Sequence, residues 1–330
     1  MARLHIAVAH GPGDAPRRRP RAPLTDVEEV IRALAAAGHE VAAVAVNGTR
    51  ESLLRLARLH VDLLFNMVEV FGEDDTKEPH VAAYFELLDL HFTGSGLRGL
   101  AMAMDKPLAK KVLQFHAIRT PRFLTVFRGR VGWADDLHFP VIVKPAREDG
   151  SIGIGFEALV HGIKELMERI DELHATFDHA VLVEEYIDGR EIYVGVLGNA
   201  PPQALPPIEL DLSHLPEGTP RIAASEVKWQ RGTRAYRGSK MRVADLAEDV
   251  VTALQDTAVT AFRALALRDY ARFDFRLAAD GTPYLIEANP NPHLHSASEF
   301  ARAARASGRT HPRTIREIVE LALRRYGVKA

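Results

Sequence analysis

Short apolar runs alternate with helical spacing over the first hundred residues. The runs at 4–10, 40–46 and 61–68 predict buried strands. Between the first two, Thr25 and Glu28 form a capping-box pattern that opens a helix. This alternation of strand and helix is typical of a parallel sheet with crossover helices.

The rest of the chain predicts two further units of mixed strands and helices. The middle unit is expected to hold a helix over 105–117, strands over 123–127 and 140–145, a glycine-rich loop over 146–155, a helix over 161–174 and a strand over 180–187. The last unit is expected to hold a helix over 243–267, a hairpin whose strands 271–278 and 283–290 flank an Asp-Gly turn, and a closing helix over 312–326. The fold class is therefore α/β, with a parallel-sheet domain at 1–96 and further domains at 97–187 and 188–330.

Composition narrows the classes of function. The 330 residues carry a net charge of −2 and no cysteine, with 47% hydrophobic and 26% charged residues. No nucleic-acid or membrane partner is expected, because the charge is balanced and no apolar run reaches the ~18 residues of a membrane span. Disulfides, thiolate metal sites and a cysteine nucleophile are excluded. The first residues lack the profile of a signal peptide, so a cytoplasmic location is expected.

The hairpin carries the clearest candidate chemistry. Strand side chains repeat every two residues, so Asp274 lies on one face of its strand, and Glu287 and Asn289 share a face of the next. Pairing of the two strands can gather these three side chains on one wall. Three oxygen ligands without sulfur favour Mg²⁺ or Mn²⁺. A polar sheet surface followed by an asparagine turn is the alternative.

Lysines and glycines in the middle unit suggest a phosphate site. Lys144 ends an apolar strand and precedes a loop that contains Gly150, Ser151 and two further glycines. Such loops let backbone N–H groups approach phosphates, and lysine adds a point charge. Lys106 begins a helix, where a lysine is usually only solvated. A plain turn would explain the glycines equally well.

Two other stretches have competing interpretations. Residues 180–192 could present backbone groups from Glu184 to Ile187 to a purine, with Glu191 on a ribose, or could be a strand that runs into a charged turn. The loop at 11–23 could be a solvated surface loop, or its arginines could receive an anionic substrate. These arginines are Arg17, Arg18, Arg19 and Arg21.

The order of these signals is more specific than any one of them. HFTGSG, AMDK, FPVIVKPAREDGSIGIG, VLVEEYIDGREI, EVKW, ARFDF and YLIEANPNP occur in this order from residue 91 to 292. The series resembles the ATP-grasp superfamily, and within it the D-alanine–D-alanine ligase family. The resemblance runs from about residue 60 to 306 and implies the ATP-grasp fold.

The resemblance also implies a role for individual residues. ATP would be bound by Lys106, Lys144, Ser151, Glu184, Glu185, Tyr186, Ile187, Glu191 and Lys228. Two Mg²⁺ (or Mn²⁺) ions would be bound by Asp274, Glu287 and Asn289. Catalysis would involve Arg272 on the oxyanion, together with Lys228 and Ser151 from two closing loops. Substrates would meet Glu73, Trp229, His293, His295 and Ser298.

The departures from the family pattern cluster on the amino-acid side. No glutamate follows the first strand in HGPGDAPRRRP, and MVEVFGEDDTKEP lacks the family's histidine. Gly150 stands where the ligases have a serine, and Trp229 where they have tyrosine or phenylalanine. In PHLHS, His293 and His295 replace a glycine and a threonine. The matched nucleotide and metal positions are all kept.

These observations predict an ATP-dependent carboxylate–amine ligase that forms an acyl phosphate and uses small-molecule substrates other than two D-alanines. Arginines in the first loop and in QRGTRAYRG (230–238) suggest a substrate with an extra acidic group.

The alternatives are a genuine D-alanine–D-alanine ligase of cell-wall synthesis, a catalytically weak nucleotide-binding regulator, and ligation to a thiol or hydroxyl acceptor. A homodimer is suggested only by the family. His295→Ala is expected to change substrate preference and Glu287→Gln to abolish ATP turnover.

Overall fold

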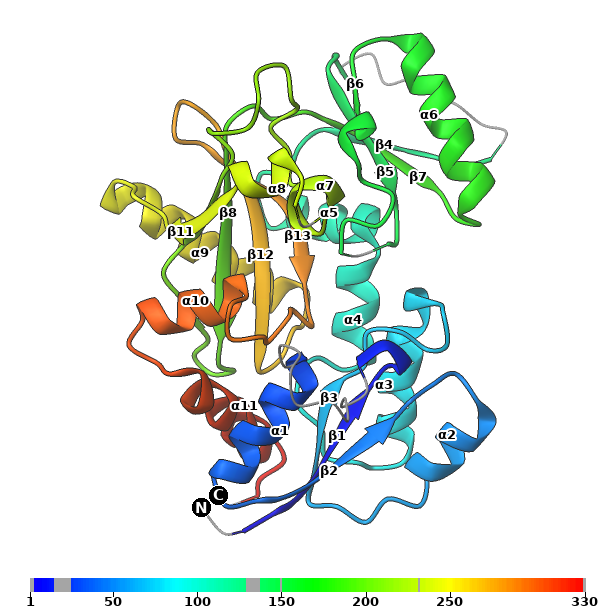
Figure 1. The fold of residues 1–330 in the computed structure, drawn as a ribbon, viewed down its shortest axis with the longest axis vertical. Helices are drawn as coiled ribbons and strands as arrows, with labels where there is room; N and C mark the ends of the chain where they lie inside the picture. Colours follow the sequence, from blue (N-terminus) through cyan, green and yellow to red (C-terminus); the bar gives the residue numbers. More distant parts are fainter. Residues whose placement is uncertain (1–2, 15–24, 129–136, 149, 231, 329–330) are drawn as a thin grey trace.

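Three β-sheets organise the chain in the computed structural model, which describes residues 3–14, 25–128, 137–148, 150–230 and 232–328. The arginines at 17–21 lie outside these ranges. Figure 1 shows the N-terminal sheet at one end of the molecule and the largest sheet in the middle. The second sheet, which contains β4 to β7, lies beside the largest sheet at the other end.

The N-terminal sheet is parallel, as the sequence predicts, with strand order β2-β1-β3. Its strands are β1 (His5–His10), β2 (Glu40–Ala45) and β3 (Leu63–Met67). Its helices are α1 (Asp26–Ala36), α2 (Arg50–Leu56) and α3 (Glu78–Leu87). The predicted capping box is present at Thr25, and such a cap stabilises a helix by about 1 kcal/mol.

Two consecutive helices lead out of this unit. α4 (Leu97–Met104) was not expected, and α5 (Lys106–Phe115) corresponds to the helix predicted over 105–117. Asp105 separates them because its backbone is extended, at φ −87° and ψ 90°, and its side chain accepts a hydrogen bond from the Leu108 amide. Lys106 is therefore the first residue of a helix.

The second sheet is antiparallel, with order β4-β7-β5-β6. Its strands are β4 (Phe123–Val126), β5 (Val141–Pro145), β6 (Leu159–Val160) and β7 (Val181–Glu185). Helix α6 (Ile163–Thr176) packs one apolar face on it, through Leu166, Ile170 and Leu173.

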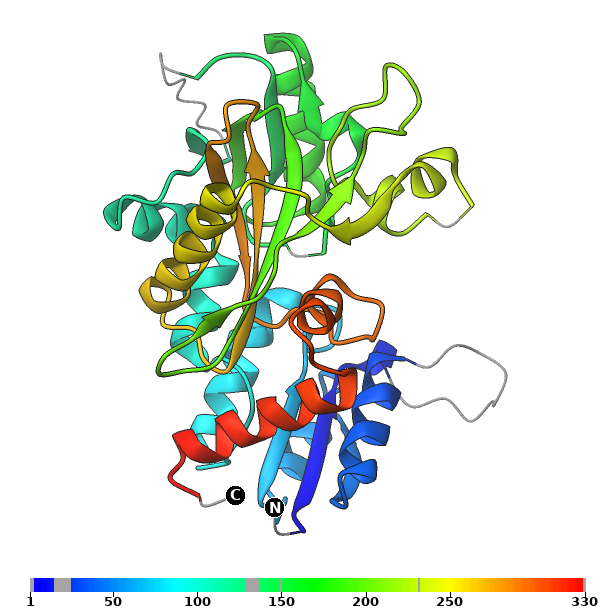
Figure 2. The ribbon, with the colours of Figure 1, turned by 90° about the vertical axis from the view of Figure 1, so that its left-hand side faces the viewer.

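The largest sheet has the order β11-β10-β8-β12-β13, and β9 pairs with β8. Its strands are β8 (Arg190–Leu197), β9 (Gln203–Ala204), β10 (Ile208–Asp211), β11 (Lys240–Val243), β12 (Tyr270–Leu277) and β13 (Pro283–Asn289). Helix α9 (Glu248–Ala264) covers one face, seen edge-on in Figure 2. The prediction that this helix starts near 243 was wrong, because Val243 pairs with Ile208 in the sheet.

The last helices return to the first unit. Short helices α7 (Ser225–Lys228) and α8 (Arg234–Gly238) precede β11, and α10 (Glu299–Ala306) and α11 (His311–Arg325) end the chain. Figure 2 shows α11 running in front of the N-terminal sheet with one end beside α1, and Ile318 shares a core with Ile6 and Phe65. Short 3-10 turns occupy Pro12–Asp14, Asp75–Lys77 and Phe156–Ala158. Within the described ranges, no helix has the length and apolarity needed to cross a membrane.

Candidate active site

Two adjoining pockets contain most of the predicted residues. The first pocket lies between the second and the largest sheet and holds about 630 Å³ of space that opens to solvent. It is lined by Ile142, Lys144, Ser151, Ile154, Glu184, Glu185, Tyr186, Ile187, Glu191, Ile222, Ala223, Lys228, Asp274, Arg276, Ile286 and Glu287. Its size and its mix of apolar and charged groups suit a nucleotide-sized ligand.

Glu184 lies at the centre of a buried charge cluster in the first pocket. It is 2% exposed, and its carboxylate is 2.5 Å from Lys144 Nζ and 2.9 Å from Lys110 Nζ. Burial raises the pKa of this carboxyl, but the two lysines outweigh burial and hold the pKa below its usual value. Glu184 is therefore ionised and paired with two lysines. Its side chain is not free to bind adenine, so adenine would be bound by the backbone that follows Glu184.

Lys110 was missed by the sequence reasoning. It follows Lys106 by four residues, so both lie on the buried face of α5, and its Nζ also donates to the Ile286 carbonyl at 3.1 Å. Burial lowers the pKa of Lys110, and Glu184 opposes that effect. The spacing of two lysines on one helical face is the signal that could have found it.

Glu287 pairs with Lys106 at 2.6 Å. Burial raises the pKa of Glu287, but Lys106 and Lys144 dominate and lower it to about 2. Lys106 also donates to the Glu148 carbonyl and lines neither pocket. Lys106 and Glu287 therefore form a salt bridge at the edge of the first pocket.

Arg272 and Asp274 form a bidentate pair on β12. Arg272 Nε and Nη2 lie 2.7 and 2.9 Å from the two Asp274 oxygens, and Glu299 approaches Arg272 at 3.5 Å. Burial raises the pKa of Asp274, and Arg272 opposes this shift. The Tyr193 ring lies beneath both Arg272 and Lys228, with their charges 5.2 and 5.7 Å from its centroid.

Arg276 lines the first pocket and contacts three other residues of its lining. Its Nη1 pairs with Glu191 at 3.0 Å, and its Nε donates to the Ile187 carbonyl at 3.0 Å. Its guanidinium also lies over the Tyr186 ring. Arg276 therefore fixes the position of Glu191 and of the backbone at Ile187.

The glycine-rich loop is docked on the segment before and within α7. Gly150, Ser151 and Gly153 have left-handed backbones, with φ of 62°, 65° and 67°. Ser151 Oγ donates to the Ala223 carbonyl at 3.1 Å, and Ser225 N donates to the Ile154 carbonyl at 2.9 Å. Two loops that are 70 residues apart in sequence thereby close the same pocket.

The second pocket lies between the N-terminal unit and the largest sheet, with about 720 Å³ of space that opens to solvent. It is lined by Glu69, Val70, Asp75, Glu78, Met104, Gly150, Ile152, Lys228, Trp229, Arg272, Asn289, Asn291, Pro292, His293 and Glu299. Lys228 lines both pockets. Several of these carboxylates were missed, because they come from loops and helix ends that carry no periodic signal.

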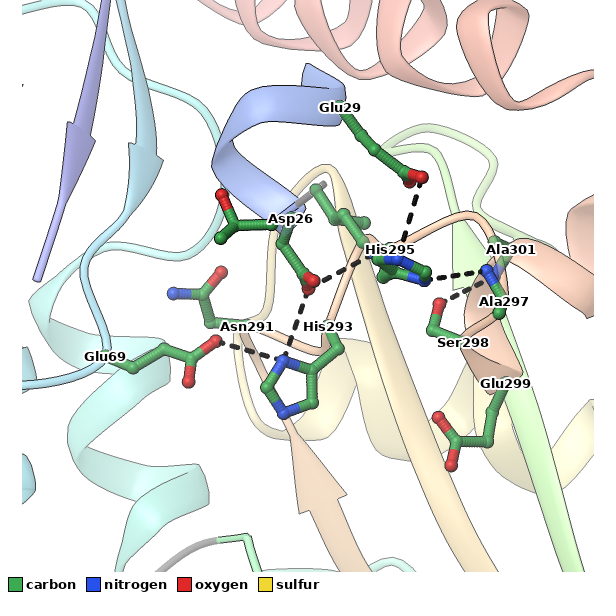
Figure 3. A network of polar contacts seen from close by, with 12 residues as sticks. Asp26, Glu29, Glu69, Asn291, His293, His295, Ala297, Ser298, Glu299 and Ala301 are labelled. Carbon is green, nitrogen blue, oxygen red and sulfur yellow. Dashed lines mark hydrogen bonds and ion pairs between the residues drawn. The ribbon is translucent and has the colours of Figure 1, made fainter. Parts of the chain in front are cut away.

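Three predicted substrate residues lie elsewhere. His295 accepts a hydrogen bond from Ala297 N and approaches Glu29 on α1 at 3.6 Å, as Figure 3 shows. Ser298 caps α10, and Glu73 is exposed. None of the three lines either pocket, and neither do Arg234 or Arg237.

The hairpin positions its predicted metal ligands at the border between the pockets. In the β12–β13 ladder Asp274 is opposite Glu287, and Arg272 is opposite Asn289. Asn289 is buried, and its amide nitrogen has no hydrogen-bond partner among the described residues. Two carboxylates and an amide suit a hard cation that takes further ligands from phosphates. Among the described residues, no cluster of three or more His, Cys, Asp or Glu is placed to hold a metal.

Comparison with known proteins identifies the family. Residues 119–320 match the model of the D-ala D-ala ligase C-terminus. The chain belongs to the D-alanine–D-alanine ligase family. The predicted family is thus confirmed.

Individual relatives and solved structures agree. A D-alanine–D-alanine ligase of Syntrophotalea carbinolica is 34% identical, covering 88% of each chain. An uncharacterised protein of Sinorhizobium fredii, y4sG, is 33% identical over 91% of this chain and 88% of its own. A Bacillus anthracis D-alanine–D-alanine ligase solved with ATP has the same fold, with a TM-score of 0.75, 21% identity, and coverage of 98% of this chain and 99% of that one. The ATP-grasp fold and an ATP-dependent ligase of this family are therefore confirmed.

Proposed function

We propose that this enzyme joins a carboxylate to an amine through an acyl phosphate, with ATP bound in the first pocket and the two organic substrates in the second. The observation that carries the proposal is the border between the pockets. Asp274 and Glu287 line the first pocket, while Arg272 and Asn289, two pairs along the same ladder, line the second. A γ-phosphoryl group at this border would face a carboxylate held next to Arg272.

The first step is phosphoryl transfer. A donor carboxylate oxygen attacks the γ-phosphorus, the bond to the β-phosphate oxygen breaks, and ADP leaves. Lys144 and Lys228 line the first pocket and would stabilise the phosphates, and Ser151 would lie over them. The backbone from Glu185 to Ile187 would bind adenine. Bound at Asp274, Glu287 and Asn289, Mg²⁺ would offset the negative charge of the phosphates.

The second step forms the amide. The amine nitrogen attacks the acyl carbon and loses a proton, and phosphate leaves with one oxygen of the donor carboxylate. Arg272 would stabilise the oxyanion of the tetrahedral intermediate. Its guanidinium is held by Asp274 and Glu299, so its direction is set before substrates arrive.

The substrates are proposed to differ from two D-alanines. Apart from Lys106, the residues matched to ATP binding line the first pocket, whereas the changed positions Gly150, Trp229 and His293 all line the second. This separation supports retained ATP chemistry with altered substrate recognition. The extra acidic group suggested by the arginines stays a prediction, since Arg234 and Arg237 line neither pocket.

An isotope experiment tests the reaction and its substrates together. The enzyme is incubated with ATP, Mg²⁺ and a panel of carboxylates and amines, and ADP is measured. For each active pair, a donor labelled with ¹⁸O in its carboxylate should give labelled phosphate. Label that stays wholly in the amide product would exclude an acyl phosphate.

The second candidate is a genuine D-alanine–D-alanine ligase. It is favoured by the relatives that carry this name at 30–36% identity. D-alanine alone would then give ADP at least as fast as any other pair in the panel. Slower turnover with D-alanine than with another pair would reject this candidate.

A further inference from the structure

Trp229 connects the two loops that close the site. It directly follows α7, and its indole Nε1 donates to the Gly150 carbonyl at 2.9 Å. The neighbouring Glu226 accepts from the Phe156 amide at 3.1 Å, which anchors the same two loops a second time. Trp229 is 52% exposed and lines the second pocket, so its ring covers the pocket on the solvent side.

His293 meets the other side of Trp229. The two rings are 5.8 Å apart between centroids and nearly perpendicular, at 74°. Figure 3 shows His293 Nδ1 directed at two carboxylates of the N-terminal unit. Asp26, the first residue of α1, lies 3.4 Å away, and Glu69, which follows β3, lies 3.7 Å away.

These contacts form one continuous connection through all three units. It runs from Gly150 in the glycine-rich loop to Trp229, then to His293 after β13, and then to Asp26 and Glu69. Gly150, Trp229 and His293 are also three of the positions at which the chain departs from the ligase pattern. The three changes therefore lie in contact with one another around a single pocket.

We propose that Trp229 and His293 form a clasp that holds the two loops and the N-terminal unit closed over the second pocket. The functional part of this inference rests on the proposed reaction, in which His293 is a positioning residue. The clasp keeps the acyl phosphate away from water until the amine attacks.

The charges around His293 determine when the clasp is closed. The hydrogen bond to Asp26 raises the pKa of His293 to about 9, burial opposes it, and Glu69 adds to it. Glu299 on α10 also faces the imidazole with a negative charge, whereas Arg272 on β12 opposes its protonation. The ion pair is therefore present at neutral pH and is lost as the pH rises through about 9.

Tryptophan fluorescence tests the clasp without any substrate. The chain has two tryptophans, so Trp133→Phe leaves Trp229 as the only emitter. A protonated imidazole quenches a neighbouring indole. We expect the emission of this variant to rise with a midpoint near pH 9, and the added His293→Asn change to remove that transition. An emission that is independent of pH from 7 to 10 would overturn the clasp.

Two controls keep this test decisive. His295→Gln changes the side chain of a histidine on the same loop that pairs with Glu29 on α1, keeps the backbone N–H that donates to Asp26, and should leave the transition in place. If Trp133→Phe does not fold, the difference between the titrations of the wild-type chain and of His293→Asn isolates Trp229, because Trp133 contributes equally to both. A zero difference would again overturn the clasp.

The functional test measures coupling. For an active substrate pair, the ratio of ADP formed to amide formed should be near one for the wild-type enzyme and severalfold higher for His293→Gly, with little change in the KM for ATP. An unchanged ratio would overturn the positioning role. If no pair yields an amide, the proposed function fails, while the fluorescence result still decides the clasp.

Discussion

The two pockets are built in different ways. The first is lined mainly from neighbouring strands, where Lys144, Glu184, Asp274 and Glu287 lie in hydrogen-bonded ladders. The second draws on loops and helix ends, with Glu69 after β3, His293 after β13 and Glu299 at the start of α10. Ladder positions are constrained by the register of both strands, whereas loop positions tolerate exchange. The positions matched to ATP binding accordingly lie mostly in the first pocket, whereas three changed positions lie in the second, beside the retained Arg272 and Asn289.

Their charges differ in the same way. In and beside the first pocket, the lysines and the carboxylates Glu184 and Glu287 are paired with one another and largely buried. In the second, Glu69 and His293 retain close to half of their side-chain exposure. A change in the first pocket should therefore affect every substrate and the fold itself, and a change in the second should redistribute activity among substrates.

The largest expected effect comes from Glu287→Gln. Removing this carboxylate should lower ADP formation by about 10³-fold with every active substrate, because the cation that Glu287 would help to hold could no longer offset the charge of the phosphates. Initial rates of ADP release measure this. Asp280→Asn, in the exposed turn of the same hairpin, is the matched control and should retain wild-type rates. A loss confined to one substrate would contradict the division between the pockets.

Glu184→Gln should lower the stability of the chain by about 3 kcal/mol, because Lys110 and Lys144 would be left buried without their carboxylate. Urea denaturation measures the free energy of unfolding. Adding Lys110→Met should recover part of the loss by removing one buried charge. A shift below about 1 kcal/mol would show that water reaches these lysines.

Lowering the pH should show how much the ionised Glu287 contributes to the free energy of unfolding. Its pKa is about 2 in the folded chain, compared with an ordinary value of 4.5. The stabilisation is therefore present above pH 4.5 and is lost as the pH falls toward 2. Between these limits the wild-type chain should lose roughly 2 kcal/mol more than Glu287→Gln. Denaturation at several pH values checks this, and parallel curves would refute it.

Glu299→Gln should have the smallest effect. Glu299 supports Arg272 from the second pocket, so its loss should raise the KM for an organic substrate about tenfold and leave the KM for ATP unchanged. His295→Ala, also on the substrate side in the sequence-based prediction, should change either KM less than threefold, because it contacts Glu29 outside the pocket. A larger effect of His295→Ala would restore the original assignment.

The sequence by itself determined which polar side chains lie on the strands of the hairpin and at the start of the glycine-rich loop. Two-residue periodicity and the Asp-Gly turn predicted that Asp274, Glu287 and Asn289 could share one wall of the hairpin, and the end of an apolar strand placed Lys144 directly before the glycine-rich loop. These relations follow from local backbone geometry, which a pattern of neighbouring residues encodes.

Only the tertiary structure decided which residues surround the second pocket. Asp26 and His293 are 267 positions apart, and no local pattern pairs a helix start with a distant loop. The same limit explains why Lys110 was missed. The loop and helix-end contacts depend on how the N-terminal unit packs against the largest sheet. Residues of α1, α10 and α11, far apart in the sequence, share the apolar core that joins them.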